Sequence, residues 1–429
     1  MTYWDSLLKL RIPVNEDPRL LPTWRKRLLL GLVCFIAIIP GFCSTIYLPA
    51  LEEITVQLDS PIGSLAAVFA NDINVLLGMR ILQAVGISSA WAIGAGSVAD
   101  IYDVHERGNA LGIYFTGQFA GPLFGPIFGG YLVERWGWRS VFWLLFVFGC
   151  ILLLLVVFAM EETYREESVW GKESKAVTQN DEKQGTTVTE NEKLELESEQ
   201  NTVTEPKMMN PFASLALLRH PFVLVFSMAT GFAFGGMFAI ENMLPGLYTS
   251  VYGLSSGVIG LTFISPGLGE VFGSLFSGKL SDYFLNRAKT QRGGGAIPED
   301  RLAPNVWPAA FILNPLSFFL WGWPVQLGWS VWVSIVMFGV QCFAMVQVFN
   351  PAMSYLVDAV SDRGASVTAA ANLVRMIWSC VLSLIANPMT QAVGPGWVTF
   401  FFGMLNFAWA FLLLLMKIKG QKIRAWSGY

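Results

Sequence analysis

Four charged residues stand inside otherwise apolar runs of the sequence, where they could bind or carry ions. Glu241 and Glu270 bring carboxyl groups, and Arg80 and Arg375 bring guanidinium groups. A charge within a membrane is expensive, so such residues face the protein interior or a water-filled path. A carboxyl group there can take up and release a proton. Glu270 is the favoured carrier, because Glu241 lies closer to a predicted helix end.

Uncharged polar side chains accompany these charges. The candidates for a substrate or proton path are Arg80, Gln83, Glu241, Glu270, Gln341, Gln347, Asn350 and Arg375. Each polar residue has an alternative interpretation as a contact between helices, and Arg80 has one as a side chain reaching the membrane interface. Arg375 has two functional interpretations, which are neutralising Glu270 and binding an anionic substrate.

Other kinds of chemistry find little support in the residue types. His105 and His220 are too few and too far apart for a metal site, and the five cysteines have unrelated spacings. The sequence contains neither a nucleophile with its base nor a nucleotide loop of the form G-x-x-x-x-G-K-[ST]. We therefore expect no enzyme, no metal, no cofactor, no nucleic-acid partner and no use of ATP.

The elements that must position these residues are predicted to be membrane-spanning helices. The 429 residues are 54% hydrophobic and 14% charged, whereas a soluble globular protein carries about 25% charged residues. The apolar residues form blocks of spanning length. Ten spans are predicted, at 28–51, 81–99, 108–133, 140–160, 221–240 and 254–280, with two in 302–357 and two in 364–416. The fold class is thus an all-α polytopic membrane protein, with the lipid bilayer as a partner.

Lysine and arginine residues predict the orientation of these spans. If the N-terminus is cytosolic, 24 Lys and Arg residues lie in cytosolic segments and 2 lie outside, with Arg80 and Arg375 in the membrane. Both termini are therefore predicted to be cytosolic, in a multi-pass protein of the plasma membrane.

An acidic interval divides the spans into two sets. Residues 161–210 hold 13 of the 31 acidic residues and 6 basic ones, with too few apolar side chains to form a packed core. The predicted organisation is a cytosolic tail (1–27), an N-terminal helical bundle (28–160), an acidic disordered linker (161–220), a C-terminal six-helix bundle (221–416) and a cytosolic tail (417–429).

The most specific motif is TGQFAGPLFGPIFGGYL, which begins at Thr116. Its small and helix-bending residues are Gly117, Gly121, Pro122, Gly125, Pro126, Gly129 and Gly130. Glycines four residues apart share one helix face and allow close approach of a neighbouring backbone. The prolines remove helix hydrogen bonds and allow bending. This pattern predicts a tight helix contact.

Three motifs resemble signatures of the major facilitator superfamily. The glycine–proline run resembles G-x-x-x-G-P-x-x-G-P-x-x-G-G, which marks exporters and lies at a helix contact that moves during alternating access. RILQAVG, which begins at Arg80, resembles R-x-x-Q-G-x-G, whose arginine is tied to proton coupling. GSLFSGKLSDYFLNR resembles the loop motif G-x-L-S-D-x-x-G-R-R, with matches at Gly278, Asp282 and Arg287. In that family the aspartate helps to hold one conformational state; a plain cytosolic turn is the alternative here.

Further matches, including STIYLPAL, WGWRSVFWL and EETYRE, make the chain similar to the fungal twelve-span drug:proton antiporter branch, particularly its quinidine-resistance-like exporters. The resemblance implies the major facilitator fold of two helical bundles in a monomer. It implies proton-coupled export of drugs, toxic metabolites or polyamines by alternating access. Two alternatives remain: export of citrate-like organic acids, and an inactive or regulatory transporter-like product.

The stretch TVQLDSPIGSLAAVFANDINVLLGMRILQ departs from the expected pattern. Only twelve uncharged residues separate Asp59 from Asp72, whereas a span needs about 20. By the resemblance, helix two, the first loop motif and the front of helix three are missing near Ser60–Pro61, so the N-terminal bundle is incomplete near 55–75. Loss of two crossings leaves the sidedness of later loops unchanged. An intact re-entrant loop is the alternative.

Overall fold

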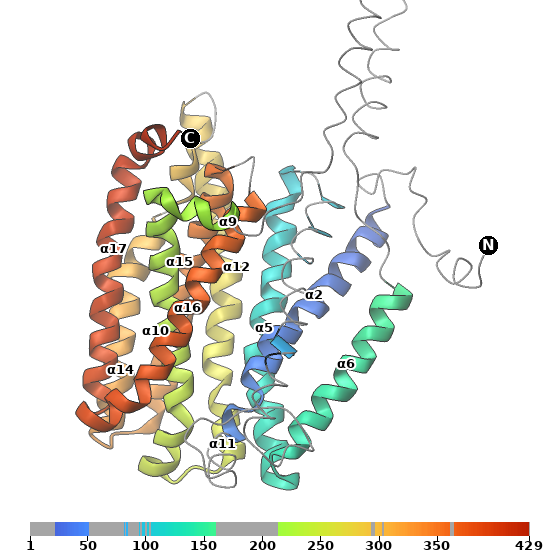
Figure 1. The fold of residues 1–429 in the computed structure, drawn as a ribbon, viewed down its shortest axis with the longest axis vertical. Helices are drawn as coiled ribbons and strands as arrows, with labels where there is room; N and C mark the ends of the chain where they lie inside the picture. Colours follow the sequence, from blue (N-terminus) through green and yellow to red (C-terminus); the bar gives the residue numbers. More distant parts are fainter. Residues whose placement is uncertain are drawn as a thin grey trace, which may run out of the picture.

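The computed structural model describes residues 22–50, 104–159, 213–292, 297–302, 304–360 and 364–428, together with eight isolated positions between 81 and 102. Every regular element in these residues is helical, as the composition predicts. The helices lie side by side with their long axes roughly aligned (Figure 1).

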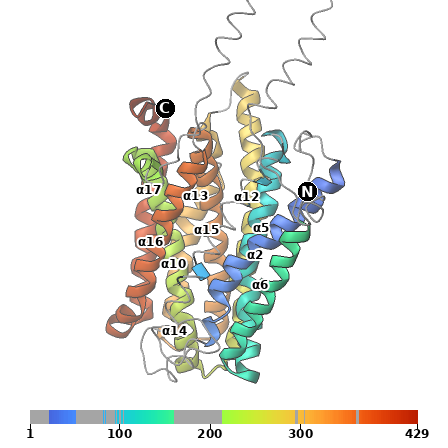
Figure 2. The same cartoon turned by 45° about the vertical axis from the view of Figure 1, so that its right-hand side comes forward.

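The first half of the chain contributes three long helices to the described residues. They are α2 (Thr23–Thr45), α5 (Val104–Trp136) and α6 (Arg139–Ala159), and the short helix η3 (Leu48–Ala50) follows α2. A tight turn joins α5 to α6, with Gly137 at φ 75°, a backbone conformation that glycine adopts without a steric penalty. Helix α2 packs along α5, and α6 flanks the pair (Figure 2).

The second half begins with two short helices, α9 (Ala213–Ala216) and η4 (Leu217–Arg219), which lie within the interval assigned to the linker. Helix α10 (Pro221–Tyr252) follows and ends at Gly253 with φ 66°. Helices α11 (Ser256–Thr262) and α12 (Ile264–Arg292) come next. The break between them precedes Pro266, whose ring would clash with the carbonyl of Thr262 in an unbroken helix. The acidic part of the linker, 161–210, lies outside the described residues.

The rest of the described second half forms four further helical runs. Its elements are η5 (Pro298–Arg301), α13 (Val306–Pro308), η6 (Ala309–Leu313), α14 (Asn314–Gln326), α15 (Val331–Ala359), α16 (Gly364–Val393) and α17 (Pro395–Trp426). The four runs are the one from α13 to α14, then α15, α16 and α17. The turn expected in WGWPVQLGW lies between α14 and α15, and the break expected in VGPGW lies at Gly394, with φ 85°. Both of these predictions are confirmed.

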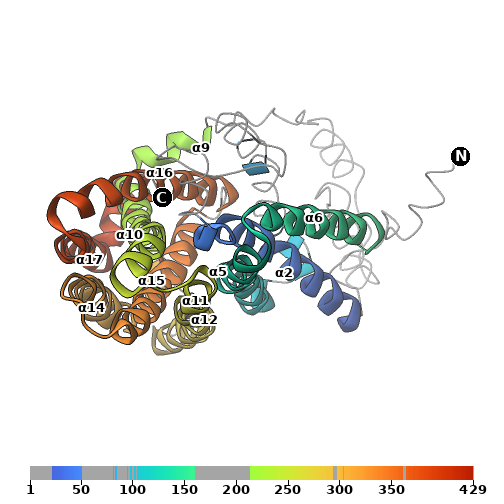
Figure 3. The same cartoon turned by 90° about the horizontal axis from the view of Figure 1, so that it is seen from below.

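Among the described residues, seven helical runs are long and apolar enough to cross a membrane. Helix α5 and the run from α13 to α14 coincide with two further predicted spans. The largest apolar core lies in the second half and extends to Leu48 and Phe119 of the first. The halves meet where α5 packs against α11 and α12, as the view along the helices shows (Figure 3).

The expectation that Gly278, Asp282 and Arg287 belong to a loop is wrong. Helix α12 continues without interruption from Ile264 to Arg292 and includes all three positions. The segment after Gly278 has no proline and many good helix formers, so nothing in it ends the helix.

Candidate functional site

The two intramembrane carboxyl groups lie close together in the second half. Glu241 on α10 is 3% exposed and Glu270 on α12 is 2% exposed. They lie within electrostatic range of each other and of Cys342 on α15. In each carboxyl group the Oε2 atom is buried and has no hydrogen-bond partner among the described residues. Buried acceptors normally have partners, so this acidic pair has spare binding capacity.

A buried cation forms a second layer of the site. Arg375 on α16 is 2% exposed, and its guanidinium carbon lies 4.3 Å from the ring centroid of Phe234 and 5.0 Å from that of Phe349. These are cation–π distances. The ring of Phe349 also lies 6.3 Å from that of Phe119 on α5. The cation layer therefore reaches the boundary between the halves.

The acidic pair and the cation layer occupy different depths in the membrane. Glu241 follows Phe234 by seven residues on α10, and Cys342 precedes Phe349 by seven on the antiparallel α15. Seven residues are two helical turns, or roughly 10 Å. Arg375 and the acidic pair therefore belong to separate layers of the site.

The polar residues of α15 divide into two groups. Gln341 is fully buried, and its Nε2 atom has no hydrogen-bond partner among the described residues. Gln347 instead donates to the carbonyl oxygen of Gly273 at 2.9 Å and accepts from Asn305 at 2.6 Å. Asn350 donates to Ser274 at 3.3 Å. Gln347 and Asn350 thus connect α15 with neighbouring segments, whereas Gln341 remains available to the site.

The glycine ladder of α5 packs against α2. A Cβ atom on Gly121 would lie 2.6 Å from the Phe42 nitrogen, and one on Gly125 would lie 2.5 Å from the Thr45 hydroxyl. Gly117 packs as closely on Cys34 of α2, and Gly129 packs on Ile46, the residue that follows α2. The four-residue spacing therefore explains a contact within the first half.

A different edge of the same motif meets the second half. A Cβ atom on Gly130 would lie 2.5 Å from the Ser256 carbonyl oxygen, and Gly260 packs directly on the Pro126 carbonyl. Gly267 packs on Leu123. The partner glycines on α11 and α12 were not among the predicted site residues, although the run SSGVIGLTFISPGLGE could have indicated them by its glycine content.

The remaining predicted residues contribute less to this geometry. Arg80 lies outside the described residues, as does the stretch 51–80 around the unusual segment. Gln83 is described and half-buried. Gly278 has open space beside it, Arg287 is exposed, and the side chain of Asp282 is not described.

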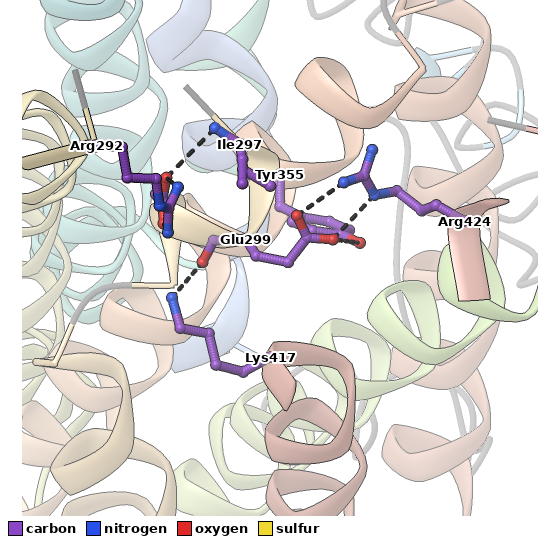
Figure 4. A network of polar contacts seen from close by, with 7 residues as sticks. Arg292, Ile297, Glu299, Tyr355, Lys417 and Arg424 are labelled. Atoms are coloured by element: carbon purple, nitrogen blue, oxygen red, sulfur yellow. Dashed lines mark hydrogen bonds and ion pairs between the residues drawn. The ribbon is translucent and has the colours of Figure 1, made fainter. Parts of the chain in front are cut away.

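A polar network that the sequence did not predict closes one end of the second half (Figure 4). Glu299 of η5 accepts hydrogen bonds from Arg424 at 2.9 and 2.8 Å and from Tyr355 at 3.4 Å. The Lys417 ammonium group donates to the Glu299 carbonyl oxygen. We call Glu299, Tyr355, Lys417 and Arg424 the Glu299 clasp. The clasp joins η5 to α15 and α17.

Known proteins resemble the chain in sequence and in fold. Residues 60–383 match the family profile described as Major Facilitator Superfamily. The MFS transporter cpaT of Aspergillus oryzae is 31% identical over 371 residues, which cover 86% of this chain and 72% of that transporter. The MFS antiporter QDR3 of Candida albicans is 23% identical, over 96% of this chain and 80% of that antiporter.

Two solved structures show the same fold. A bacterial homologue of the human lysosomal transporter Spinster, inward-facing and unoccupied, matches 93% of this chain and 98% of its own, with a TM-score of 0.57 and 14% identity. The E. coli xylose transporter XylE, partially occluded and inward-open, matches 96% of this chain and 91% of its own, with a TM-score of 0.54 and 14% identity.

Two details of these matches bear on the predicted gap near Ser60–Pro61. The family match begins at residue 60, so it leaves out α2, although α2 packs along α5. The alignment with the QDR3 antiporter runs over 566 positions, more than the 429 residues of this chain. That antiporter therefore has segments that this chain lacks. The start of the family match coincides with the predicted join.

Proposed function

The chain belongs to the major facilitator superfamily of membrane transporters, and on this premise we propose that its site serves proton-coupled export of organic cations. The substrate class comprises amphipathic drugs, toxic metabolites and polyamines. Protons and substrate compete for the acidic pair formed by Glu241 and Glu270, and alternating access moves each across the bilayer. The expected sidedness, with both termini cytosolic, places the inward mouth at the end that carries the Glu299 clasp.

The observation that carries this proposal is the burial of two neighbouring carboxyl groups with unpartnered oxygen atoms. Two like charges held close together in an apolar interior strongly favour binding of a cation or a proton. A proton satisfies the pair at one stage of the cycle, and a positively charged substrate satisfies it at another. The antiporter title of the QDR3 relative supports exchange of this kind.

Binding of a lipophilic cation is expected to depend on pH through Glu270. Purified chain in detergent should bind tetraphenylphosphonium more tightly as pH rises, because deprotonation frees the acidic pair, and should release protons on binding. If each cation that binds displaces one proton, the affinity for tetraphenylphosphonium should rise by up to about tenfold per pH unit. Isothermal titration in buffers of different ionisation enthalpy measures both quantities.

Glu270→Gln should remove the pH dependence and the proton release. Glu134→Gln is the matched control, because Glu134 is an exposed carboxylate near the end of α5. Cation binding that is independent of pH in the unmodified chain would contradict the proposal, as would full proton release from the Glu270→Gln variant.

One observation favours a second candidate, the export of organic acids. Arg375 offers a buried positive charge between two aromatic rings at the boundary of the halves, which suits the carboxylate of a citrate-like organic acid. In the same titration, citrate would then bind in place of tetraphenylphosphonium. Binding of citrate that disappears in Arg375→Gln and persists in Glu270→Gln would select this candidate.

We further propose that the first half lacks helix two and the front of helix three, with the join near Ser60–Pro61. The match that begins at residue 60 and the longer alignment with the QDR3 antiporter support this. In the second half, α16 packs on α10. Among the described helices of the first half, which are α2, α5 and α6, none packs closely against α16. A chain with an incomplete first bundle binds substrate in the second half but transports it poorly.

A further inference from the structure

Helix α17 is longer than a bilayer requires. Its 32 residues span roughly 48 Å, whereas the hydrocarbon core is about 30 Å thick. The surplus lies at the C-terminal end, where the apolar run is followed by the basic stretch IKGQKIRAW. This end of α17 therefore passes through the headgroup region and beyond it.

The Glu299 clasp fixes which side of this extension faces the protein. Lys417 and Arg424 both bond to Glu299. Gly420 lies between them on the same face, and a Cβ atom there would lie 2.8 Å from a Glu299 carboxyl oxygen. At 100° per residue, these three α17 positions fall within about 60° of one another. The helix cannot rotate without breaking the clasp.

The opposite face of the extension is exposed and carries a different set of residues. Ile418 is 72% exposed and Trp426 is 80% exposed, and Lys419 and Lys422 are exposed as well. These four positions fall within about 100° of one another, and their centre is opposite the face held by the clasp. We call them the outer basic face.

The outer basic face continues a lipid-facing stripe. The exposed apolar residues that precede it along the same side of α17 are Trp397, Met404, Phe411 and Leu415. The stripe changes from purely apolar to basic at Lys419 and ends with an aromatic residue. Lysines that extend to phosphates, with tryptophan at the interface, are typical of the membrane boundary.

We propose that the outer basic face is a docking surface for the headgroups of anionic phospholipids in the adjacent leaflet. Lys419 and Lys422 bind the lipid phosphates, Ile418 contacts the uppermost acyl segments, and Trp426 lies farther out, among the headgroups. Charge complementarity selects this partner, because both ammonium groups are exposed, whereas Lys417 and Arg424 of the same helix are engaged by Glu299. The clasp transmits the position of this face to η5 and α15.

Lipid binding to the full chain tests this assignment. Native mass spectrometry of the detergent-solubilised protein would count bound phosphatidylserine during a titration, with phosphatidylcholine of the same chains as the neutral reference. Replacing two surface lysines is expected to weaken retention of the anionic lipid by roughly thirtyfold. The variant is Lys419→Gln/Lys422→Gln, and its thermal stability should equal that of the unmodified chain, since both side chains are exposed.

Lys419→Arg/Lys422→Arg is the matched control and should retain phosphatidylserine. Inorganic phosphate at the same concentration should not displace the lipid, because phosphate cannot replace the apolar contact between the lipid and Ile418. Equal retention by the glutamine variant and the unmodified chain would overturn the proposal. Equal binding of the two lipids, or displacement by inorganic phosphate, would overturn it too.

Discussion

Replacing Gly121 by leucine is expected to separate α2 from α5 and to destabilise the first half by more than about 3 kcal/mol, since overpacking ordinarily costs about 1–3 kcal/mol. A Cβ atom on Gly121 would lie 2.6 Å from the Phe42 nitrogen and 2.8 Å from the Gly41 Cα atom. These are backbone atoms, which cannot move aside as a flexible side chain does. Fluorescence-detected size-exclusion chromatography with heating would show loss of the monodisperse peak or a large fall in its midpoint temperature.

Gly149→Leu supplies the control for this experiment. Gly149 also lies in a spanning helix, α6, and a Cβ atom there meets nothing within 4 Å. That variant should elute and melt like the unmodified chain. A Gly121→Leu protein with an unchanged midpoint would show that α2 and α5 do not meet in this register.

Removal of Arg424 is expected to have the second large effect. In the Glu299–Arg424 pair, the side chains are 9% and 14% exposed, and the closest atoms lie 2.8 Å apart. Arg424→Met leaves the carboxylate of Glu299 nearly buried without its main partner, which costs about 3–5 kcal/mol for a buried pair. A thermal-shift measurement in detergent would detect this loss, and the double variant Glu299→Gln/Arg424→Met should regain part of it.

Arg301→Met is the control that separates the effect of burying an ion pair from the effect of merely removing one. Arg301 pairs with Asp358 at 2.8 Å, but these side chains are 19% and 34% exposed, and exposed pairs contribute about 0–1 kcal/mol. Equal losses of stability in Arg301→Met and Arg424→Met would contradict the role assigned to the Glu299 clasp.

Much of the fold could be predicted from the sequence, because each apolar block is long enough to require a helix in lipid. The turns before Val331 and at Gly394 follow from glycine and proline placed between such blocks. The end of α12 could not be predicted in this way. Its last turns are polar, and composition alone does not distinguish a helix that leaves the membrane from a loop.

The site was only partly predictable for a related reason. Glu241, Glu270 and Arg375 stand out because charges are rare in apolar runs, and all three are buried in the second half. Their separation into two layers depends on the rotation and depth of α10, α12, α15 and α16, which no local pattern specifies. The Glu299 clasp was missed because its residues come from segments far apart in the sequence and look individually like surface charges.

The measurement that tests the central claim most directly is flux in proteoliposomes with an imposed pH gradient. Two proteins would be compared: the 429-residue chain, and a chain with helix two and the front of helix three of the QDR3 antiporter inserted at Ser60–Pro61. The completed chain should move tetraphenylphosphonium against its gradient and stop when a protonophore is added. The 429-residue chain should exceed empty liposomes only slightly. Equal gradient-driven flux from both proteins would contradict the incomplete first bundle, and flux indifferent to the protonophore would contradict proton coupling.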